Sequence, residues 1–460
     1  MNDLVLPDGL VATLISSESQ RGLATEAGAV ADYLDAHRDV EPLDVSRMLM
    51  RTREIRRFRA LIRATGRDDA IAALRAVAAG TPHPNATVSS RPATSRRVAL
   101  VFPGQGSQRA GMGRGHYERC PEYRRRVDEV NAEFIAEAGI APLDYLLDDE
   151  HVEDVKIVQP AIFLHTLGLA RMWRAAGVEP VATVGHSQGE IAAVVESGHM
   201  SLRDGIRVVT VRAQEIEKLE NSGDYPPCAM AVFALRRDQL EDRLARLTGW
   251  AELAVVNSST IHALSGYEDV IDALVAEYRE AGVFAQRIGV DHAGHSARLR
   301  RHGKVFSGAH AGLEASSFAD GDLMCFGATL GEPITPELPI SDYWSWNLRN
   351  TVRFDSAIAT AAAHGIDTFI EMSEHPTMLL SIGETLAENG VRAAVVGTGN
   401  KNADAAAEFT RNLSTVIVDD TQFRWPTIES GSVPIDFPNT EFDEALYWAP
   451  VSAPQPVAAR

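Results

Sequence analysis

The sequence predicts an α/β fold, in which a largely parallel sheet is covered by helices and a smaller unit is inserted. Short apolar runs that end at turn residues, such as Val98–Phe102, alternate with stretches of helical periodicity. Over 229–290 the order changes to strand, helix, strand, strand, helix, strand, which is the ferredoxin-like order. A chain of 460 residues also exceeds one compact domain, so several are expected.

Residues 1–95 are predicted to form a helical or mixed N-terminal linker domain. Residues 1–80 have a helical pattern, and 47–67 combines apolar residues with many arginines. Those arginines form either a solvated helix face or a docking surface for an acidic partner. The Thr-, Pro- and Ser-rich stretch 80–95 is expected to be a linker.

The main body is predicted at 96–228 and 291–400, with the inserted subdomain at 229–290. Its expected strands lie at 98–102, 180–184, 368–372 and 393–396, and its helices at about 158–177 and from Gly189 onward. Residues 401–460 are predicted to be a C-terminal linker strip. Within it, 437–448 should pack on the body, and the Pro- and Ala-rich end from 449 should be disordered.

Composition restricts the possible partners and the compartment. The net charge of −19 argues against nucleic-acid binding, which needs a basic surface. The three cysteines lie far apart, so neither a disulfide framework nor a metal site is expected. No signal peptide or membrane-spanning apolar run is found, and we expect a cytoplasmic protein without membrane contacts.

The pattern Gly-His-Ser-Gln-Gly at 185–189 carries the strongest chemical signal. It follows a predicted strand and opens a predicted helix, so the glycines allow a sharp turn that exposes the hydroxyl of Ser187. A serine nucleophile needs a base, and fourteen histidines are available. The cluster at 291–296, with His292 and His295 after the last inserted strand, is the best candidate, but the residues alone leave the choice open.

Seven blocks in order make the chain similar to a known family. They are VFPGQGSQ at 101–108, VQPA at 158–161, GHSQGE at 185–190, VRAQ at 211–214, HAGH at 292–295, YWSWNLR at 343–349 and EMSEHP at 371–376. The chain thereby resembles the acyltransferase domain of modular type I polyketide synthases, which is related to malonyl-CoA:acyl-carrier-protein transacylases. The resemblance implies an α/β-hydrolase-like large subdomain with a ferredoxin-like small subdomain. It extends to the linker domain before such acyltransferases and to the segment after them.

The resemblance also implies roles for individual residues. Ser187 is the expected nucleophile and His295 the expected base. The backbone N–H groups of Gln105 and Gln188 are expected to form the oxyanion hole. A backbone carbonyl, which maps to Asn347, is expected to orient the histidine in place of a triad aspartate.

Arg212 is expected to bind the free carboxylate of a malonyl-type unit, because a buried cation disfavours acyl groups that lack a carboxylate. The implied donor is therefore a malonyl-type acyl-CoA. The implied acceptor is the phosphopantetheine thiol of an acyl carrier protein, and no bound cofactor or metal is expected.

His186, His292 and Gly294 are expected to line the acyl pocket. His292 resembles the form that goes with malonyl units, whereas Gln188 resembles the form that goes with methylmalonyl. Gly294 leaves room for a larger substituent on C2. The identity of the extender unit, the partner carrier protein and the presence of further synthase domains stay open.

Two other function classes compete with this interpretation. A serine hydrolase or thioesterase of the α/β-hydrolase type also has a serine elbow, but it requires an acid and has no need of Arg212. A catalytically silent docking module would keep the fold without the chemistry. The basic run Arg298, Arg300, Arg301 and Lys304 is either a contact for an acidic carrier protein or a solvated helix face. Thr351, where the family usually has proline, is expected to loosen the loop that orients His295.

Overall fold

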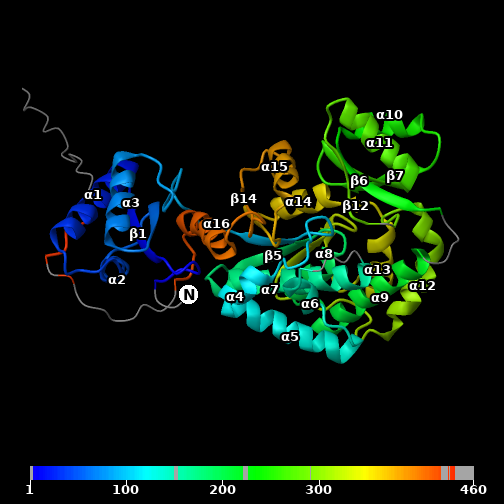
Figure 1. Ribbon diagram of the computed structural model, residues 1–460, viewed down its shortest axis with the longest axis horizontal. Helices are drawn as coiled ribbons and strands as arrows, with labels where there is room; N and C mark the ends of the chain where they lie inside the picture. Colours follow the sequence, from blue (N-terminus) through cyan, green and yellow to red (C-terminus); the bar gives the residue numbers. More distant parts are fainter. Residues whose placement is uncertain are drawn as a thin grey trace, which may run out of the picture. The chain divides into compact units, whose positions relative to one another are not determined.

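The computed structural model describes residues 4–149, 154–220, 226–290, 292–425, 434 and 436–440. The chain divides into two compact units (Figure 1). One is built mainly from Ser95–Pro426 and the other mainly from Gly9–Thr94. The larger unit holds every residue that the motifs single out.

The smaller unit is a mixed α/β unit rather than a helical one. Its sheet is antiparallel, in the order β1 (Val11–Ser17), β2 (Phe58–Ala64), β3 (Ala86–Val88). Its helices are α1 (Gln20–Ala36), α2 (Pro42–Thr52) and α3 (Arg67–Ala79). The predicted linker at 80–95 is therefore wrong in part, since β3 pairs with β2.

The helical pattern predicted over 1–80 is wrong for the second half of 47–67. That half is β2, the central strand of the sheet, and it is buried on both faces after Phe58. Arg59 and Arg63 are buried because their guanidinium groups reach backbone carbonyls of Arg56 (2.8 Å) and Pro84 (3.1 Å). These two arginines are thus structural and belong to neither a solvated helix face nor a docking surface.

The larger unit is organised by a six-stranded sheet. The strand order is β11-β10-β5-β4-β13-β14, and all neighbours are parallel except β10 and β11. The strands are β4 (Val98–Phe102), β5 (Pro180–Gly185), β10 (Met324–Gly327), β11 (Glu332–Pro333), β13 (Thr368–Glu371) and β14 (Ala394–Val396). The central strand β4 is buried along its whole length, as the apolar run predicts.

Helices cover both faces of this sheet (Figure 1). On one side lie α4 (Arg114–Arg119), α5 (Pro121–Ala138), α6 (Leu143–Leu147), α7 (Val155–Ala175), α8 (Gly189–Glu196) and α9 (Leu202–Glu220). On the other lie α14 (Phe354–Ala363) and α15 (Leu379–Glu388). The remaining helices are α12 (Gly303–Ala309), α13 (Ile340–Arg349) and α16 (Ala405–Asp419). The predicted α/β class with a parallel sheet is confirmed.

The inserted subdomain has the predicted ferredoxin-like order. Its elements are β6 (Cys228–Ala234), α10 (Arg237–Ala245), β7 (Ala251–Val256), β8 (Ile261–Tyr267), α11 (Glu268–Glu280) and β9 (Ala285–Arg287). The sheet order is β12-β7-β8-β6-β9, where β12 (Val352–Arg353) is contributed by the main body. This shared strand connects the inserted subdomain to the main body.

The two faces of the inserted sheet have different neighbours. Ala229, Ala231 and Phe233 of β6 pack with α10 and α11. Met230, between them in sequence, belongs instead to the core that contains strands β4 and β5 of the main sheet. This alternation is the period of two expected for a strand, and it turns Met230 toward the main body.

The C-terminal strip predicted from 401 onward begins with a helix of the main body. Helix α16 is capped by Asp404, whose carboxylate accepts from the N–H groups of Ala406 (3.1 Å) and Ala407 (3.0 Å). Phe409 of this helix packs edge to face on Trp173 at 4.9 Å, so the predicted boundary at 400 falls too early. Phe437 packs on Tyr33 in the smaller unit (5.0 Å), and the rest of the predicted strip beyond 440 lies outside the described residues.

Candidate active site

Ser187 lies on a tight turn between β5 and α8. Its φ of 54° is in the left-handed region, which is strained for a non-glycine residue. The glycines on either side are required by close approach. A Cβ at Gly185 would lie 2.3 Å from Cα of Glu190, and a Cβ at Gly189 would lie 2.2 Å from the carbonyl oxygen of Pro103. The turn therefore projects the hydroxyl beyond the carboxyl end of the parallel strand, as the motif predicts.

His295 lies against this hydroxyl. Its Nε2 is 2.7 Å from Oγ of Ser187, and its Nδ1 is 3.1 Å from the carbonyl oxygen of Asn350. Because a carbonyl can only accept, Nδ1 carries the hydrogen and the lone pair of Nε2 faces Ser187. Burial holds the pKa of His295 well below its ordinary value, and nearby Arg212 lowers it further. The imidazole is thus neutral and ready to accept a proton.

The carbonyl that orients His295 belongs to Asn350 and not to Asn347, so that expectation is wrong. Asn347 lies within α13, where its carbonyl points along the helix, whereas Asn350 follows the last turn and its carbonyl is available. The side chain of Asn347 has another role, described below. Thr351 does not leave the loop untied, since its hydroxyl donates to the carbonyl of Leu253 in β7 (3.1 Å).

The expected oxyanion donors lie on both sides of Ser187. Gln188 is buried at the start of α8, and no acceptor in the described part of the chain pairs with its backbone N–H. Gln105 lies on the loop after β4, where its side-chain oxygen accepts from Nε2 of Gln159 at 2.8 Å. That bond joins the loop to α7 and explains how the Val-Gln-Pro-Ala block serves the site.

Both subdomains line the cavity at Ser187, which has a volume of about 50 Å³. Met230 and Val255 come from the inserted sheet, while Gln105, Arg212 and His295 come from the main body. His186 is held by Oδ1 of Asn257 (2.9 Å), and burial lowers its pKa to about 4, so it is a neutral wall residue.

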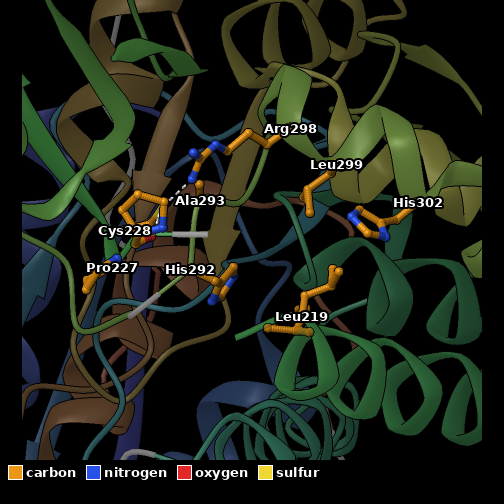
Figure 2. A pocket seen from close by; sticks show the side chains of 10 residues that line it. Leu219, Pro227, Cys228, His292, Ala293, Arg298, Leu299 and His302 are labelled. Atoms are coloured by element: carbon orange, nitrogen blue, oxygen red, sulfur yellow. Dashed lines mark hydrogen bonds between the residues drawn. The ribbon is translucent and has the colours of Figure 1, made fainter. Parts of the chain in front are cut away.

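His292 lines this cavity and also a second one beside it, shown in Figure 2. Gly294 does not line either cavity. A Cβ added there would lie 3.3 Å from Nε2 of His292 and 3.5 Å from Sδ of Met230. The glycine thus leaves space behind two wall residues of the catalytic cavity.

Arg212 of α9 also faces the catalytic cavity and is 4% exposed. Its Nη1 donates to Oδ1 of Asn347 at 2.6 Å, and its Nε has no partner among the described residues. No carboxylate of that described part forms an ion pair with it, and burial lowers its pKa to about 10, so it remains a cation at neutral pH. A buried, incompletely paired guanidinium is a binding site for an anion.

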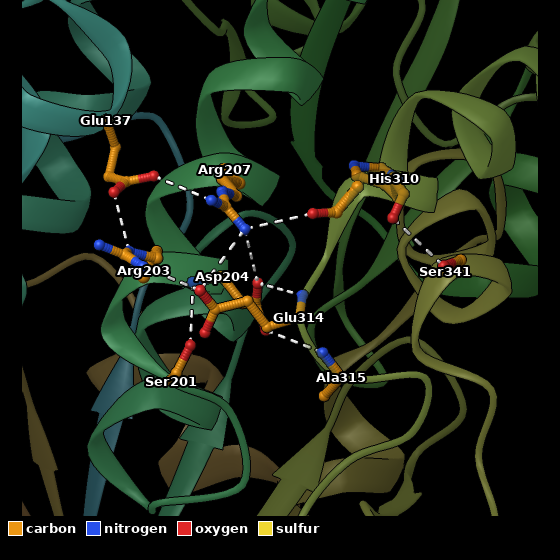
Figure 3. Close-up of polar contacts among 10 residues, drawn as sticks. Glu137, Ser201, Arg203, Asp204, Arg207, His310, Glu314, Ala315 and Ser341 are labelled. Atoms are coloured by element: carbon orange, nitrogen blue, oxygen red, sulfur yellow. Dashed lines mark hydrogen bonds and ion pairs between the residues drawn. The ribbon is translucent and has the colours of Figure 1, made fainter.

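The helix that carries Arg212 is fixed at its other end by a polar cluster, shown in Figure 3. Asp204 is 1% exposed and accepts from the backbone N–H of Glu314 (2.9 Å). Arg207 donates to the carbonyl of Gly312 (3.2 Å) and pairs with Glu137 of α5 (3.1 Å). These contacts hold α9 against α5 and the 312–315 loop. The helix that carries Arg212 is therefore held in place.

A further polar group near Arg212 was not among the predicted site residues. Glu190 is fully buried and accepts from the hydroxyl of Tyr343 and from the N–H and hydroxyl of Thr329 (both 3.1 Å). Asn347 Nδ2 donates to Thr329 Oγ1 (3.0 Å) and to the carbonyl of Ser187 (3.0 Å). Asn347 therefore joins Arg212, the serine turn and Glu190. Glu190 and Tyr343 both lie in quoted sequence blocks, which was the available signal.

In the part of the chain that the structure describes, no metal site and no membrane-spanning helix is found. The described residues contain no group of three or more His, Cys, Asp or Glu side chains arranged to hold a metal ion. None of the helices in that same part of the chain is long and apolar enough to cross a bilayer.

The tight turn at Ser187, the neutral histidine beside it and the inserted sheet are features that an α/β acyltransferase would need. The acyl transferase domain family model matches residues 99–422, and the chain belongs to that family. The predicted resemblance to polyketide synthase acyltransferases and the assignment as an acyltransferase are thereby confirmed.

Individual relatives agree with this assignment. Erythronolide synthase EryA3 of Saccharopolyspora erythraea is 31% identical over 97% of the chain, which spans only 14% of that synthase. The acyltransferase domain from module 8 of the salinomycin polyketide synthase has a TM-score of 0.79 at 30% identity, over 89% of this chain and 96% of that one. The acyltransferase domain of SpnD, solved in complex with 2-(pent-4-yn-1-yl)malonyl, has a TM-score of 0.75 at 25% identity, over 89% and 97%.

Proposed function

We propose that this chain moves a malonyl-type extender unit from CoA to the phosphopantetheine thiol of an acyl carrier protein. The transfer is a ping-pong reaction through an ester on Ser187. The observation that carries the proposal is the 2.7 Å contact between Ser187 Oγ and the neutral Nε2 of His295, beside the buried cation of Arg212.

In the first half-reaction, Oγ of Ser187 attacks the thioester carbonyl while its proton passes to Nε2 of His295. The backbone N–H groups of Gln105 and Gln188 stabilise the oxyanion. The C–S bond then breaks, and the imidazolium returns the proton to the departing CoA thiolate. In the second half-reaction the carrier thiol gives its proton to His295 and attacks the ester, and Ser187 recovers its hydrogen.

Arg212 sets the substrate class. An acyl group with a free carboxylate pairs with the guanidinium, whereas an acetyl group leaves that buried charge without a counter-ion. The structural neighbour solved with a 2-substituted malonyl group supports the same class for this chain. Gly294 supports a substituent on C2, because a Cβ there would crowd the wall residues His292 and Met230, although malonyl itself also fits.

The competing functions are less well supported. In a serine hydrolase of the α/β-hydrolase type, an acidic side chain orients the histidine, but here a backbone carbonyl does so. A silent docking module has no need for a serine turn with strained φ or for a dyad with hydrogen-bonding geometry.

Intact-mass measurement tests the proposal. Incubation with malonyl-CoA should add one malonyl group to the wild-type chain, and Ser187→Ala should remove that adduct. Addition of the acceptor, a phosphopantetheinylated carrier protein with a free thiol, should then discharge the ester faster than water does. An adduct that survives in Ser187→Ala, or an ester that only water discharges, would contradict the proposal.

A further inference from the structure

The second cavity lies beside the catalytic one and shares a wall with it. It has a volume of about 290 Å³, and His292 lines both cavities. Figure 2 shows the ring of His292 directed into this cavity, with Leu219 and Leu299 on one side and Pro227 and Cys228 on the other. We refer to it as the side cavity. The imidazole of His292 is therefore the partition between the side cavity and the reacting acyl group.

Helix α9 connects the two cavities along one face. Arg212 lines the catalytic cavity, and Ile216 and Leu219 line the side cavity. The spacing of four and then three residues places all three side chains on the same helix face. At 1.5 Å per residue, Ile216 lies about 6 Å and Leu219 about 10 Å along the axis from Arg212. A group that extends from a carboxylate held by Arg212 along this face enters the side cavity.

The walls of the side cavity suit a hydrocarbon. Six of the ten described residues that line it are apolar, namely Ile216, Leu219, Pro226, Pro227, Ala293 and Leu299, and the others are Cys228, His292, Arg298 and His302. An amide-bearing chain such as a pantetheine arm would lose hydrogen bonds to water there, and few groups would replace them.

Arg298, the cation in this wall, is engaged by the protein. Its guanidinium donates to Sγ of Cys228 (3.1 Å) and to the hydroxyl of Tyr267 (2.9 Å). It also stacks over the rings of Trp250 and Tyr267, at 4.6 Å from each centroid. Arg298 is thus not part of a solvated basic face, and it closes the wall without creating an anion site.

We infer that the side cavity receives the substituent on C2 of the extender unit, so that the chain takes malonyl units with a hydrocarbon branch longer than methyl. This inference rests on the proposed function and specifies its substrate. Gly294 contributes because a Cβ there would lie 3.3 Å from the ring of His292. Without that Cβ, the ring of His292 can move aside when the branch enters. Leu219 is the residue that sets the length of the branch.

Competition between malonyl-CoA and hexylmalonyl-CoA, followed by intact mass, tests the inference. Wild-type protein should acquire both adducts. Leu219→Phe fills the cavity and should lower the ratio of hexylmalonyl to malonyl adduct by about tenfold or more. Val305→Phe makes the same kind of change at a site on α12 that is 52% exposed, and it should leave the ratio unchanged.

Leu219→Ala gives a second readout that does not depend on tolerance of a larger side chain. It enlarges the cavity and should raise the ratio of decylmalonyl to hexylmalonyl adduct several-fold. The inference is overturned if wild-type protein takes malonyl but not hexylmalonyl, or if neither substitution at Leu219 changes a ratio. If no carboxylated acyl-CoA labels Ser187 at all, the proposed function itself is wrong, and that outcome is distinct.

Discussion

The two ends of the catalytic cavity are built differently. At the dyad end both ring nitrogens of His295 have partners, Ser187 Oγ and the carbonyl of Asn350. At the other end Arg212 has one hydrogen bond, an Nε without a partner among the described residues, and no counter-ion in that same part of the chain. Under the proposed function, the dyad end is complete for proton transfer before substrate arrives, whereas a substrate carboxylate would complete the arginine end.

Removal of the dyad should have the largest effect and should not depend on the acyl group. Ser187→Ala should abolish self-acylation, because it lacks the oxygen that is acylated, and His295→Ala should lower the rate by about 10,000-fold. Rates are measured by quenched-flow intact-mass analysis with malonyl-CoA and acetyl-CoA. A large difference between the two substrates in the fold-loss of rate would contradict the claim that the dyad end acts independently of the acyl group.

Substitution of Arg212 should be smaller in effect and should depend on the acyl group. Arg212→Ala should lower loading of malonyl-CoA by about 150- to 5,000-fold, which corresponds to the roughly 3–5 kcal/mol of a broken buried ion pair. Loading of acetyl-CoA should rise, because the unpaired cation is gone. Arg212→Lys keeps the charge without the two-pronged geometry and should fall between wild type and alanine. Equal losses for both substrates would contradict the carboxylate role.

The sequence predicts the dyad end and the arginine end unequally well. Ser187 lies in a short local pattern, because a strand, a turn and a helix start are formed by neighbouring residues. The residues alone leave the choice of histidine open, and the resemblance identifies His295. The partner of Nδ1 was assigned to Asn347 instead of Asn350, because the choice between them depends on where α13 ends and how the chain leaves it. Arg212 alone looks like an ordinary helical arginine, and only the resemblance identified it.

Other features could not be predicted because they arise from contacts distant in sequence. The side cavity brings together α9, β6 and the loop after His295, and no local pattern marks it. The prediction that Arg59 and Arg63 are solvated or form a docking surface is wrong, because both lie on a strand that is buried on both faces. A count of charges assumes that arginine side chains are solvated and does not show that their aliphatic parts are buried. Helix α16 was missed since its burial depends on Trp173, far away in sequence.

Asn347 joins the two ends, and its substitution should affect both moderately. Asn347→Ala removes the bonds to Arg212 Nη1 and to the carbonyl of Ser187, and it should lower malonyl loading by about tenfold. Acetyl loading should fall less, because only the serine contact bears on it. Asn389→Ala, which removes a helix-end contact to Thr385 on α15, is a matched control that should leave both rates unchanged. Additive effects of Asn347→Ala and Arg212→Ala would show that the two ends are independent.

The smallest expected effect concerns the electrostatic balance at the arginine end. Burial raises the pKa of Glu190 to about 7, although hydrogen bonds from Tyr343 and Thr329 act in the opposite direction. Below that pH Glu190 is neutral, and the charge of Arg212 is fully available to a substrate carboxylate. As the pH rises through about 7, Glu190 ionises and its negative charge partly compensates Arg212.

The KM for malonyl-CoA should therefore rise by about threefold between pH 6 and pH 8.5, because the two charges interact through intervening polar groups. The kcat should stay level, since the low pKa of His295 keeps that base neutral across the same range. Glu190→Gln keeps a side chain of the same shape but removes the titration, so its KM should vary little with pH. If the rise in KM persists in Glu190→Gln, the titrating group is a residue other than Glu190. If kcat changes with pH instead, the titrating group lies at the dyad end, with Ser187 and His295.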